Sequence, residues 1–269
     1  MRKDFLGKDY SKLLSKKLYL FDMDGTIYRE NYLFDGVKEL FKQIDNNGGK
    51  YVFITNNSSK SVFDYVNKLK NMGLDVNEEN FFTSTQAAIR LFKSKFNDKL
   101  IYAQGTKSFI EELKNNGLNV TLEYDESACA VLLGFDPELT GEKLRITCKM
   151  LTKLNIPYYA TNPDWVCPVD FGFIPDCGSM CFGIEKATGK MPIYIGKPQP
   201  TMINVVMEKF NCTKEETVVF GDRLYTDIAS GYNAGVDTVL VLSGEATMDD
   251  YKKSEIKSTY VLNSVKDML

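Results

Sequence analysis

The sequence of 269 residues contains no histidine. Without an imidazole, the chain cannot form a Ser-His-Asp triad, a histidine-assisted cysteine nucleophile, an H-E-x-x-H zinc site or a phosphohistidine. Any chemistry must therefore come from carboxylates, lysines, hydroxyls and backbone amides.

Cysteines at metal-binding spacing are also missing. The six cysteines lie at positions 129, 148, 167, 177, 181 and 212, and no two of them form a C-x-x-C pair. Zinc and redox sites usually need such pairs or accompanying histidines. We therefore expect reduced and mostly buried thiols.

Long apolar runs and a basic surface are absent as well. No apolar run approaches the roughly 20 residues that cross a bilayer, and segment 1–17 lacks the hydrophobic stretch of a secretory signal. The 33 basic and 36 acidic side chains nearly balance and form no positive stripe, on which nucleic-acid binding depends. We expect a cytoplasmic protein that binds neither nucleic acid nor membrane.

What the sequence does contain is an alternation of short apolar runs and amphipathic helical stretches. This alternation is typical of an α/β fold with a doubly wound, mainly parallel sheet. The expected strands are 18–21, 51–54, 81–82, 99–103, 128–135, 156–160, 193–195, 217–220 and, as the final strand, 237–242.

Three helices can be placed between these strands. The first should end at Gly48 and Gly49, and its apolar face consists of Val37, Leu40, Phe41 and Ile44. The second should end before Gly73, and its apolar side consists of Val62, Phe63, Val66, Leu69 and Met72. A later helix should begin at Pro200.

The positions of the polar loops divide the chain into two expected domains. Residues 1–84 and 189–269 would form a discontinuous core, and residues 85–188 a smaller inserted α/β domain. Within the insertion, loop 162–180 carries the only tryptophan, Trp165, with Phe171 and Phe173. These aromatic side chains have two interpretations, which are packing inside the inserted domain and contact with a substrate.

Two carboxylates follow the first strand. Side chains two residues apart on a strand point to the same face, so Asp22 and Asp24 should enter one pocket, with Gly25 allowing a sharp turn behind them. Two close carboxylates repel each other unless a cation neutralises them or one holds a proton. Mg²⁺ fits because it prefers oxygen ligands and retains waters that a phosphate can replace.

Three other strand ends supply complementary groups: Thr55, Asn56 and Asn57 after the second strand, Lys197 before a helix, and Asp222 with Asp227 after another strand. In open α/β sheets, ligands bind outside the carboxyl ends of the strands, where these groups would converge. A nucleophilic carboxylate, an acid, a metal, a cation and hydrogen-bond donors together predict a phosphoryl-transfer site.

These residues resemble the four ordered motifs of the haloacid dehalogenase superfamily. The motifs read Asp22-Met23-Asp24-Gly25-Thr26, then Thr55-Asn56, then Lys197, and finally Gly-Asp-Arg-Leu-Tyr-Thr-Asp at 221–227. The insertion is similar to the α/β cap of the NagD-like, p-nitrophenylphosphatase-type branch. That similarity includes Thr161-Asn162-Pro163-Asp164 and Gly178-Ser179.

The resemblance implies a role for each motif. Asp22 would become an aspartyl phosphate, and Asp24 would act as general acid and base. Mg²⁺ would be bound by Asp22, the backbone carbonyl of Asp24 and Asp222, with Gly221, Arg223 and Asp227 in support. Phosphoryl oxygens would be bound by Thr55, Asn56, Asn57 and Lys197.

The inserted cap would recognise the leaving group. The resemblance points to Asn162, Asp164 and Asp176 for this role, although glycine is expected at or near Asp176. Relatives in this branch often pair through the cap, so a homodimer is a further expectation.

The leading functional hypothesis is a Mg²⁺-dependent phosphatase of small phosphorylated metabolites. The alternatives are a phosphotransferase or phosphomutase of the same superfamily and a non-catalytic phosphorylatable receiver. Receivers are near half this length and lack a large insertion. The superfamily's dehalogenases lack the second aspartate, so Asp24 argues against that activity.

Overall fold

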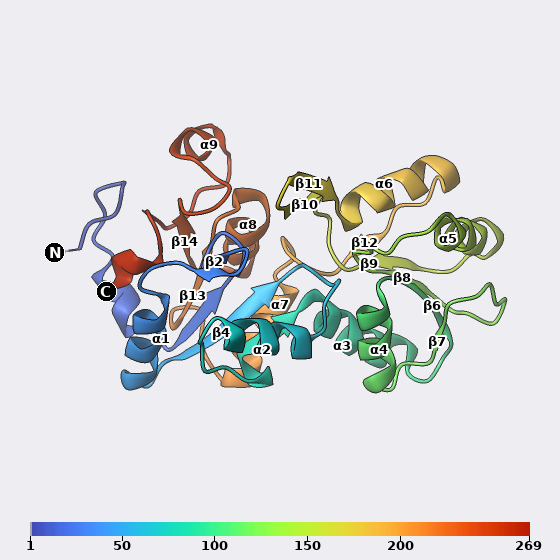
Figure 1. Ribbon diagram of the computed structural model, residues 1–269, viewed down its shortest axis with the longest axis horizontal. Coiled ribbons are helices and arrows are strands. Elements are labelled where there is room, and N and C mark those ends of the chain that lie inside the picture. The colour runs from blue at the N-terminus through green and yellow to red at the C-terminus, as the bar shows by residue number, and fades with distance from the viewer. Residues whose placement is uncertain (1) are drawn as a thin grey trace. The chain divides into compact units, whose positions relative to one another are not determined.

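The computed structural model describes residues 2–269, which form two compact units. The first unit contains the residues up to Thr55, Val66–Phe82 and Lys197–Leu269, and the second contains Asn56–Tyr65 and Thr83–Gly196. Both units are built from mainly parallel strands and from helices (Figure 1), which confirms the α/β class.

The first unit has a six-stranded sheet in the order β15-β14-β13-β1-β4-β5. Its strands are β1 (Leu18–Phe21), β4 (Lys50–Thr55), β5 (Phe81–Thr83), β13 (Thr217–Gly221), β14 (Asp237–Val241) and β15 (Tyr260–Leu262). Strand β1 pairs in parallel with both β13 and β4, with Phe21 opposite Phe220 and Phe53. The carboxyl ends of these three strands therefore lie at the same edge of the sheet.

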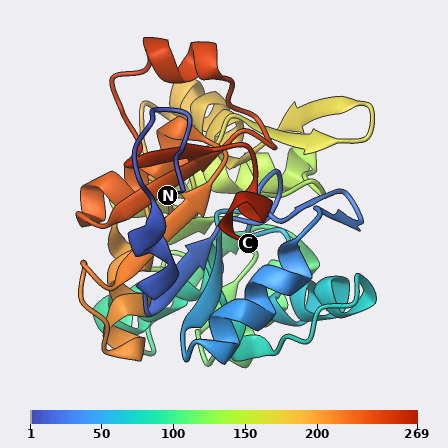
Figure 2. The same cartoon turned by 90° about the vertical axis from the view of Figure 1, so that its left-hand side faces the viewer.

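The helices of the first unit are α1 (Val37–Asn46), the part of α2 (Val62–Asn71) from Val66 onward, α7 (Thr201–Phe210), α8 (Ala229–Ala234) and α9 (Met248–Lys253). Figure 2 shows the first unit from the side on which α1 and both chain ends lie. The chain ends are joined by a hydrogen bond from the Arg2 guanidinium to the Met268 carbonyl. All four residues of the predicted α1 face are buried, and Pro200 directly precedes α7 as expected.

Two expectations, one for α2 and one for β14, are wrong. Phe63 does not belong to the apolar side of α2, because its side chain is 64% exposed while Tyr65 is buried. The buried set Val62, Tyr65, Val66 and Leu69 has the helical spacing of three and four residues. Strand β14 is also not the final strand, since β15 pairs with it in parallel.

The second unit has a five-stranded sheet in the order β12-β9-β8-β6-β7. These strands are β6 (Ile101–Gln104), β7 (Val120–Thr121), β8 (Val131–Leu133), β9 (Tyr158–Ala160) and β12 (Ile193–Tyr194), with helices α3 (Ser84–Phe96), α4 (Lys107–Asn115), α5 (Gly141–Lys153) and α6 (Cys177–Thr188). Because β12 pairs with β9, the second unit extends to Gly196, whereas the inserted domain was expected to end at 188.

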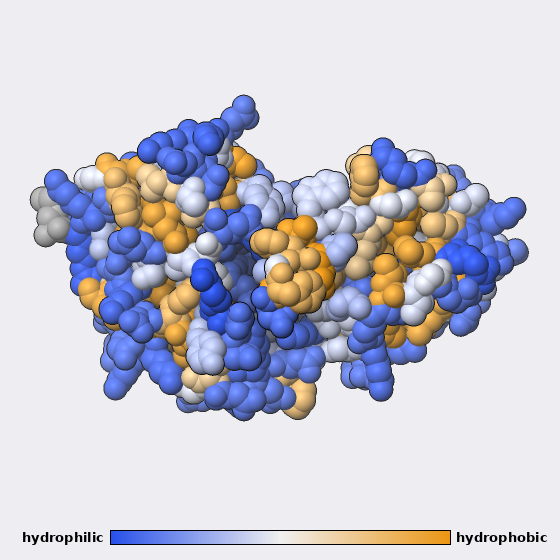
Figure 3. Space-filling model, turned by 45° about the horizontal axis from the view of Figure 1, so that its top comes forward, coloured by the Kyte–Doolittle hydropathy of each residue, from blue (hydrophilic) through white to orange (hydrophobic). Residues whose placement is uncertain are grey.

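Segment 162–180 is not the irregular loop that the sequence suggested. It contains an antiparallel hairpin of β10 (Val166–Val169) and β11 (Gly172–Pro175). Trp165, Phe171 and Phe173 are 56%, 79% and 63% exposed, so they do not form part of a core. Figure 3 shows the resulting group of apolar side chains over this hairpin.

The six cysteines are free thiols, as expected, but only Cys177 and Cys181 are buried and the other four are partly exposed. Within residues 2–269, none of the helices combines the length and the apolar composition required to cross a bilayer.

Candidate active site

The first acidic residue of the site follows β1 directly. Strand β1 is apolar and completely buried between β13 and β4, and the amide of Asp22 donates to the carbonyl of Phe220 at 2.9 Å. The chain then turns at Gly25, whose φ of +79° lies in the left-handed region that favours glycine. The strand thereby fixes the backbone from which the Asp22 carboxylate projects.

The second acidic segment follows β13. Asp222 comes directly after Gly221, and Asp227 lies on a π-helical turn at Leu224–Ile228. A Cβ atom on Gly221 would be 2.1 Å from Cβ of Asp227, so only glycine allows this turn to fold back onto the strand end. The amide of Arg223 donates to Asp227 Oδ2 at 3.1 Å and holds that carboxylate in place.

Lys197 joins the two acidic segments. Its side chain is 2% exposed, and its Nζ donates to Asp22 Oδ1 at 2.6 Å, to Asp227 Oδ1 at 2.5 Å and to the carbonyl of Ile54 at 3.1 Å. Ile54 belongs to β4, so this one ammonium group contacts the ends of two strands and the π turn. The structure therefore brings Asp22, Lys197, Asp222 and Asp227 together, as the motif order predicted.

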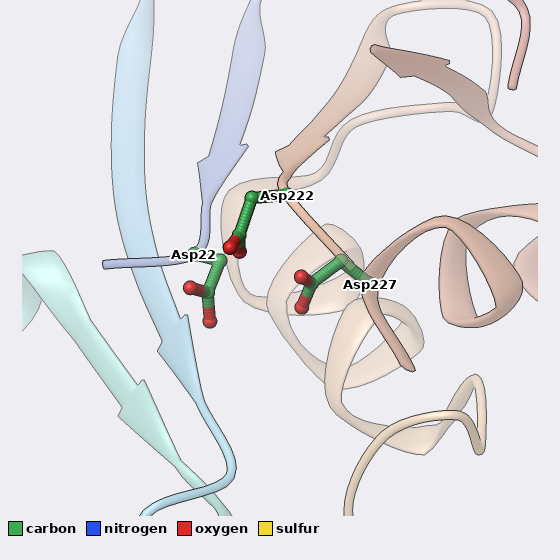
Figure 4. A group of neighbouring side chains, drawn as sticks. All are labelled: Asp22, Asp222 and Asp227. Atoms are coloured by element: carbon green, nitrogen blue, oxygen red, sulfur yellow. The ribbon is translucent and has the colours of Figure 1, made fainter. Parts of the chain in front are cut away.

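The three carboxylates face a common space (Figure 4). One ligand oxygen from each of Asp22, Asp222 and Asp227 lies within 4.8 Å of the others. Lys197 donates hydrogen bonds to two of these carboxylates, and the charge of Arg223 also acts on Asp222, so the carboxylates outnumber the cations. The excess of negative charge in a buried place is the main electrostatic property of the site.

This excess of negative charge shifts the pKa values of the side chains in the site. Burial and the Asp227 carboxylate raise the pKa of Asp22 well above its usual range. The same two causes raise the pKa of Asp222 to about 7. Burial lowers the pKa of Lys197, but the carboxylates of Asp22 and Asp227 outweigh burial and raise it above its usual value. Without a further cation, the cluster therefore retains protons near neutral pH.

The cluster has the donors that a magnesium ion needs. All three side chains offer carboxylate oxygens, which Mg²⁺ prefers, and a divalent ion would cancel the excess charge. In addition, Asp222 Oδ1 is buried and has no hydrogen-bond partner among the described residues. A buried carboxylate oxygen without a donor is costly unless it binds a ligand, so the residues fit a hard divalent cation.

Asp24 lies outside this group of three carboxylates. Its side chain is exposed, and its Oδ2 accepts a hydrogen bond of 3.0 Å from the hydroxyl of Tyr28, which is completely buried. The ammonium group of Lys68 lies 3.8 Å from the centre of the Tyr28 ring. Tyr28 was not identified from the sequence, because a buried tyrosine four residues after an aspartate carries no signal of its own.

The three residues after β4 have different surroundings. Thr55 ends the strand and is buried, whereas Asn56 and Asn57 belong to the second unit. The side-chain amide of Asn56 donates to Asp164 Oδ2 at 3.0 Å. The side-chain oxygen of Asn57 accepts hydrogen bonds from the backbone amide and the hydroxyl of Ser59. Both side chains thus stabilise the second unit locally. Phosphate binding by Thr55, Asn56 and Asn57 stays a prediction.

The residues expected to set specificity form a buried polar cluster in the second unit. The side-chain amide of Asn162 donates to Asp164 Oδ2 at 2.8 Å and to Asp176 Oδ1 at 3.0 Å. Asp176 also accepts from the amide of Cys177 at the start of α6. These contacts explain why Asp176 can stand where a glycine was expected. Contact of the cluster with a substrate stays a prediction.

Arg223 and the chain after β14 complete the surroundings of Asp222. Arg223 forms an ion pair of 2.8 Å with Glu245, and its positive charge opposes the rise of the Asp222 pKa. The amide of Glu245 donates to Asp222 Oδ2 at 2.7 Å. Sequence reasoning missed Glu245 because a backbone donor can come from any residue type.

The fold and the matching family models define a hydrolase of the phosphatase type. A family model for haloacid dehalogenase-like hydrolases matches residues 19–119, and a HAD-hydrolase-like model matches residues 194–268. Among curated relatives, the acid sugar phosphatase of Staphylococcus haemolyticus is 32% identical over 94% of both chains. The ribonucleotide monophosphatase NagD of Escherichia coli is 32% identical over 92% of this chain and 96% of its own.

Solved structures give the same result. A 4-nitrophenylphosphatase from Thermotoga maritima is 37% identical, with a TM-score of 0.90 over 96% of this chain and 98% of its own. A glycerol phosphate phosphatase from Mycobacterium tuberculosis in complex with magnesium is 25% identical, with a TM-score of 0.89 over 97% of this chain and 78% of its own. The chain belongs to the haloacid dehalogenase-like hydrolases, in the NagD-like branch. It is an enzyme of the phosphoric monoester hydrolase class.

Proposed function

We propose that this protein is a Mg²⁺-dependent phosphatase of small phosphorylated metabolites that acts through an aspartyl phosphate on Asp22. The observation that carries the proposal is the cluster of partly exposed Asp22 with buried Asp222, Asp227 and Lys197, with its excess of negative charge. The relatives named above act on sugar phosphates, ribonucleotides, glycerol phosphate or nitrophenyl phosphate by their names. A phosphate monoester of a small alcohol or phenol is common to all four.

In the first step, Asp22 attacks the phosphorus atom and the bond to the ester oxygen breaks. Lys197 binds Asp22 Oδ1 and so holds the carboxylate in one orientation for attack. Asp24 gives its proton to the departing alkoxide, which leaves as an alcohol. Positioning of this kind accounts for a large part of enzymatic rate acceleration.

In the second step, water attacks the phosphorus of the aspartyl phosphate. Asp24 takes a proton from that water, the acyl phosphate bond breaks, and Asp22 and inorganic phosphate are released. Asp22, Asp222 and the Asp24 carbonyl would hold Mg²⁺. When bound, the ion would neutralise the carboxylates and the phosphoryl oxygens, so that two groups of like charge can meet.

The experiment that tests the proposal measures phosphate release from p-nitrophenyl phosphate and from a panel of sugar phosphates, nucleoside monophosphates and glycerol phosphate. Each reaction is run with Mg²⁺ and with a chelator. Turnover of small monoesters that requires Mg²⁺ is expected. Equal turnover in the chelator would contradict the metal dependence, and no turnover of any monoester would contradict the function.

Replacing Asp24 with asparagine should separate substrates by their leaving group. The variant lacks the proton donor, and general acid catalysis typically contributes about 10²–10⁴-fold. We expect a loss of this size for glycerol phosphate and a smaller loss for p-nitrophenyl phosphate, whose phenolate leaves without a proton. Equal losses for both substrates in kcat/KM, which reports the first step alone, would contradict the role of Asp24 as the proton donor.

Loss of the proton from Asp222 should make the metal-free protein less stable as the pH rises. The folded-state pKa is raised to about 7, above the unfolded value, so the folded state binds more protons and its stability falls between the two values. For this carboxyl alone we expect a loss of roughly 2 kcal/mol between about pH 5.5 and pH 7.

Thermal unfolding in a chelator and in Mg²⁺ measures this effect. Mg²⁺ should raise the unfolding temperature more at about pH 8 than at about pH 5.5, because it binds the deprotonated carboxylates. The Asp222→Asn variant is the control and should show a flatter pH dependence in the chelator. Identical pH profiles for the variant and the wild type would rule out Asp222 as the titrating group.

A further inference from the structure

A short loop after β14 lies directly against Asp222. It consists of Ser243, Gly244 and Glu245 and is called the 243–245 loop. The amide of Glu245 donates to Asp222 Oδ2 at 2.7 Å, and the amide of Ala246 donates to the Asp222 carbonyl at 3.1 Å. The loop and the residue that follows it therefore bind both the side chain and the backbone of Asp222.

The close approach of the loop depends on Gly244. A Cβ atom on Gly244 would be 2.0 Å from Asp222 Oδ2 and 2.5 Å from its Cβ, which is far inside van der Waals contact. A Cβ atom on Gly25 would be 2.3 Å from the same oxygen and 3.0 Å from Cα of Gly244. Two glycines from distant parts of the sequence thus make room for one carboxylate.

Three further bonds tie the loop to both acidic turns. The Ser243 hydroxyl donates to the carbonyl of Gly25 at 2.8 Å, and the guanidinium of Arg29 donates to the carbonyl of Ser243 at 3.1 Å. The carboxylate of Glu245 pairs with Arg223 at 2.8 Å. The loop is therefore attached to the turn after Asp22 as well as to the turn after Asp222.

The two carboxylate oxygens of Asp222 differ in their hydrogen bonding. Oδ2 is bound by the Glu245 amide, whereas Oδ1 is buried without a partner among residues 2–269. The whole residue is 3% exposed, and its carboxylate is part of the acidic cluster in Figure 4. A hydrogen bond to Oδ2 restricts rotation of the carboxylate, and Oδ1 is left available to bind another ligand.

We propose that the 243–245 loop is a positioning element that orients Asp222, so that Oδ1 is presented to the divalent cation. The inference rests on the proposed function, in which Asp222 is a metal ligand. Groups that orient metal ligands commonly change metal affinity by about 10–100-fold when they are altered. The loop should therefore set the affinity for Mg²⁺ more than the rate of the chemical step.

The test is isothermal titration of Mg²⁺ into the substrate-free Gly244→Ala variant. We expect the dissociation constant for Mg²⁺ to rise by about 10-fold or more, while kcat at saturating Mg²⁺ changes less than the half-saturating Mg²⁺ concentration. Gly183→Ala in α6 is the matched control, because a Cβ there has no atom within 4 Å. It should bind Mg²⁺ as the wild type does.

A milder variant covers the case in which Gly244→Ala does not fold. Ser243→Ala removes only the hydroxyl that binds the Gly25 carbonyl, and we expect a dissociation constant about threefold higher. Wild-type affinity in a folded Gly244→Ala variant, or in Ser243→Ala if that alone folds, would overturn the inference. A wild-type protein that hydrolyses phosphate esters but binds no Mg²⁺ would overturn the metal part of the proposed function, and the inference with it.

Discussion

Replacing Asp22 with asparagine should lower kcat for p-nitrophenyl phosphate by on the order of 10⁴-fold or more, since loss of a catalytic nucleophile has effects of that size. The amide has the same shape as the carboxylate but cannot attack phosphorus. The measurement is steady-state release of nitrophenolate in saturating Mg²⁺.

The fold should survive this substitution, which separates catalysis from stability. Burial and the Asp227 charge already raise the pKa of Asp22, so a neutral group at this position is tolerated in the metal-free protein. We expect an unfolding temperature in chelator at or above that of the wild type. Asp249→Asn, at an exposed position in α9, is the control and should keep wild-type kcat. Substantial turnover by Asp22→Asn would contradict the nucleophile assignment.

Replacing Lys197 with methionine should reduce both activity and stability. The ammonium group is the partner of two carboxylates in a buried place, and removing one partner of a buried ion pair costs about 3–5 kcal/mol. Repulsion among Asp22, Asp222 and Asp227 would then be opposed by fewer positive charges. We expect a lower unfolding temperature and a loss of at least about 10²-fold in kcat, as for removal of one oxyanion donor.

Lys16 provides a matched control for this loss. Its side chain is also buried, with 6% exposure, and its Nζ pairs with Asp237 at 2.6 Å. Lys16→Met should therefore lose stability but retain kcat under conditions where it remains folded. If both variants retain kcat, Lys197 is a structural lysine only. If both lose kcat equally, loss of activity reflects folding rather than chemistry.

The parts of the fold that were predictable from the sequence are those with local signals. Strand β1 and helix α1 have clear periodicity, and the glycines after α1 mark its end. Strand β15 has only three residues, and its place is set by pairing with β14 rather than by its own pattern. The β10–β11 hairpin is exposed on most of its residues, so it lacks the alternation of buried and exposed residues that identifies a strand.

The candidate site likewise contains residues that the sequence predicts and residues that it does not. Asp22 and Asp222 follow β1 and β13, and the topology of a parallel sheet brings such strand ends to one edge. Lys197 precedes α7 and follows a strand of the other sheet, so its place in the site is predicted from the motif order alone. The contacts of Tyr28, Asn56 and Glu245 were not predictable. The Asn56–Asp164 bond and the Glu245–Asp222 bond join residues 108 and 23 positions apart, and no local pattern specifies such pairings.

The proposed mechanism requires that the phosphoryl group bonds to Asp22 during turnover. The most direct test mixes the Asp24→Asn variant with p-nitrophenyl phosphate and Mg²⁺, quenches in acid during the first turnovers and maps the peptides by mass spectrometry. We expect the peptide that contains Asp22 to gain the mass of one phosphoryl group, because the variant forms the acyl phosphate and hydrolyses it slowly. An unmodified Asp22 peptide, in samples where nitrophenolate has been released, would contradict the covalent mechanism.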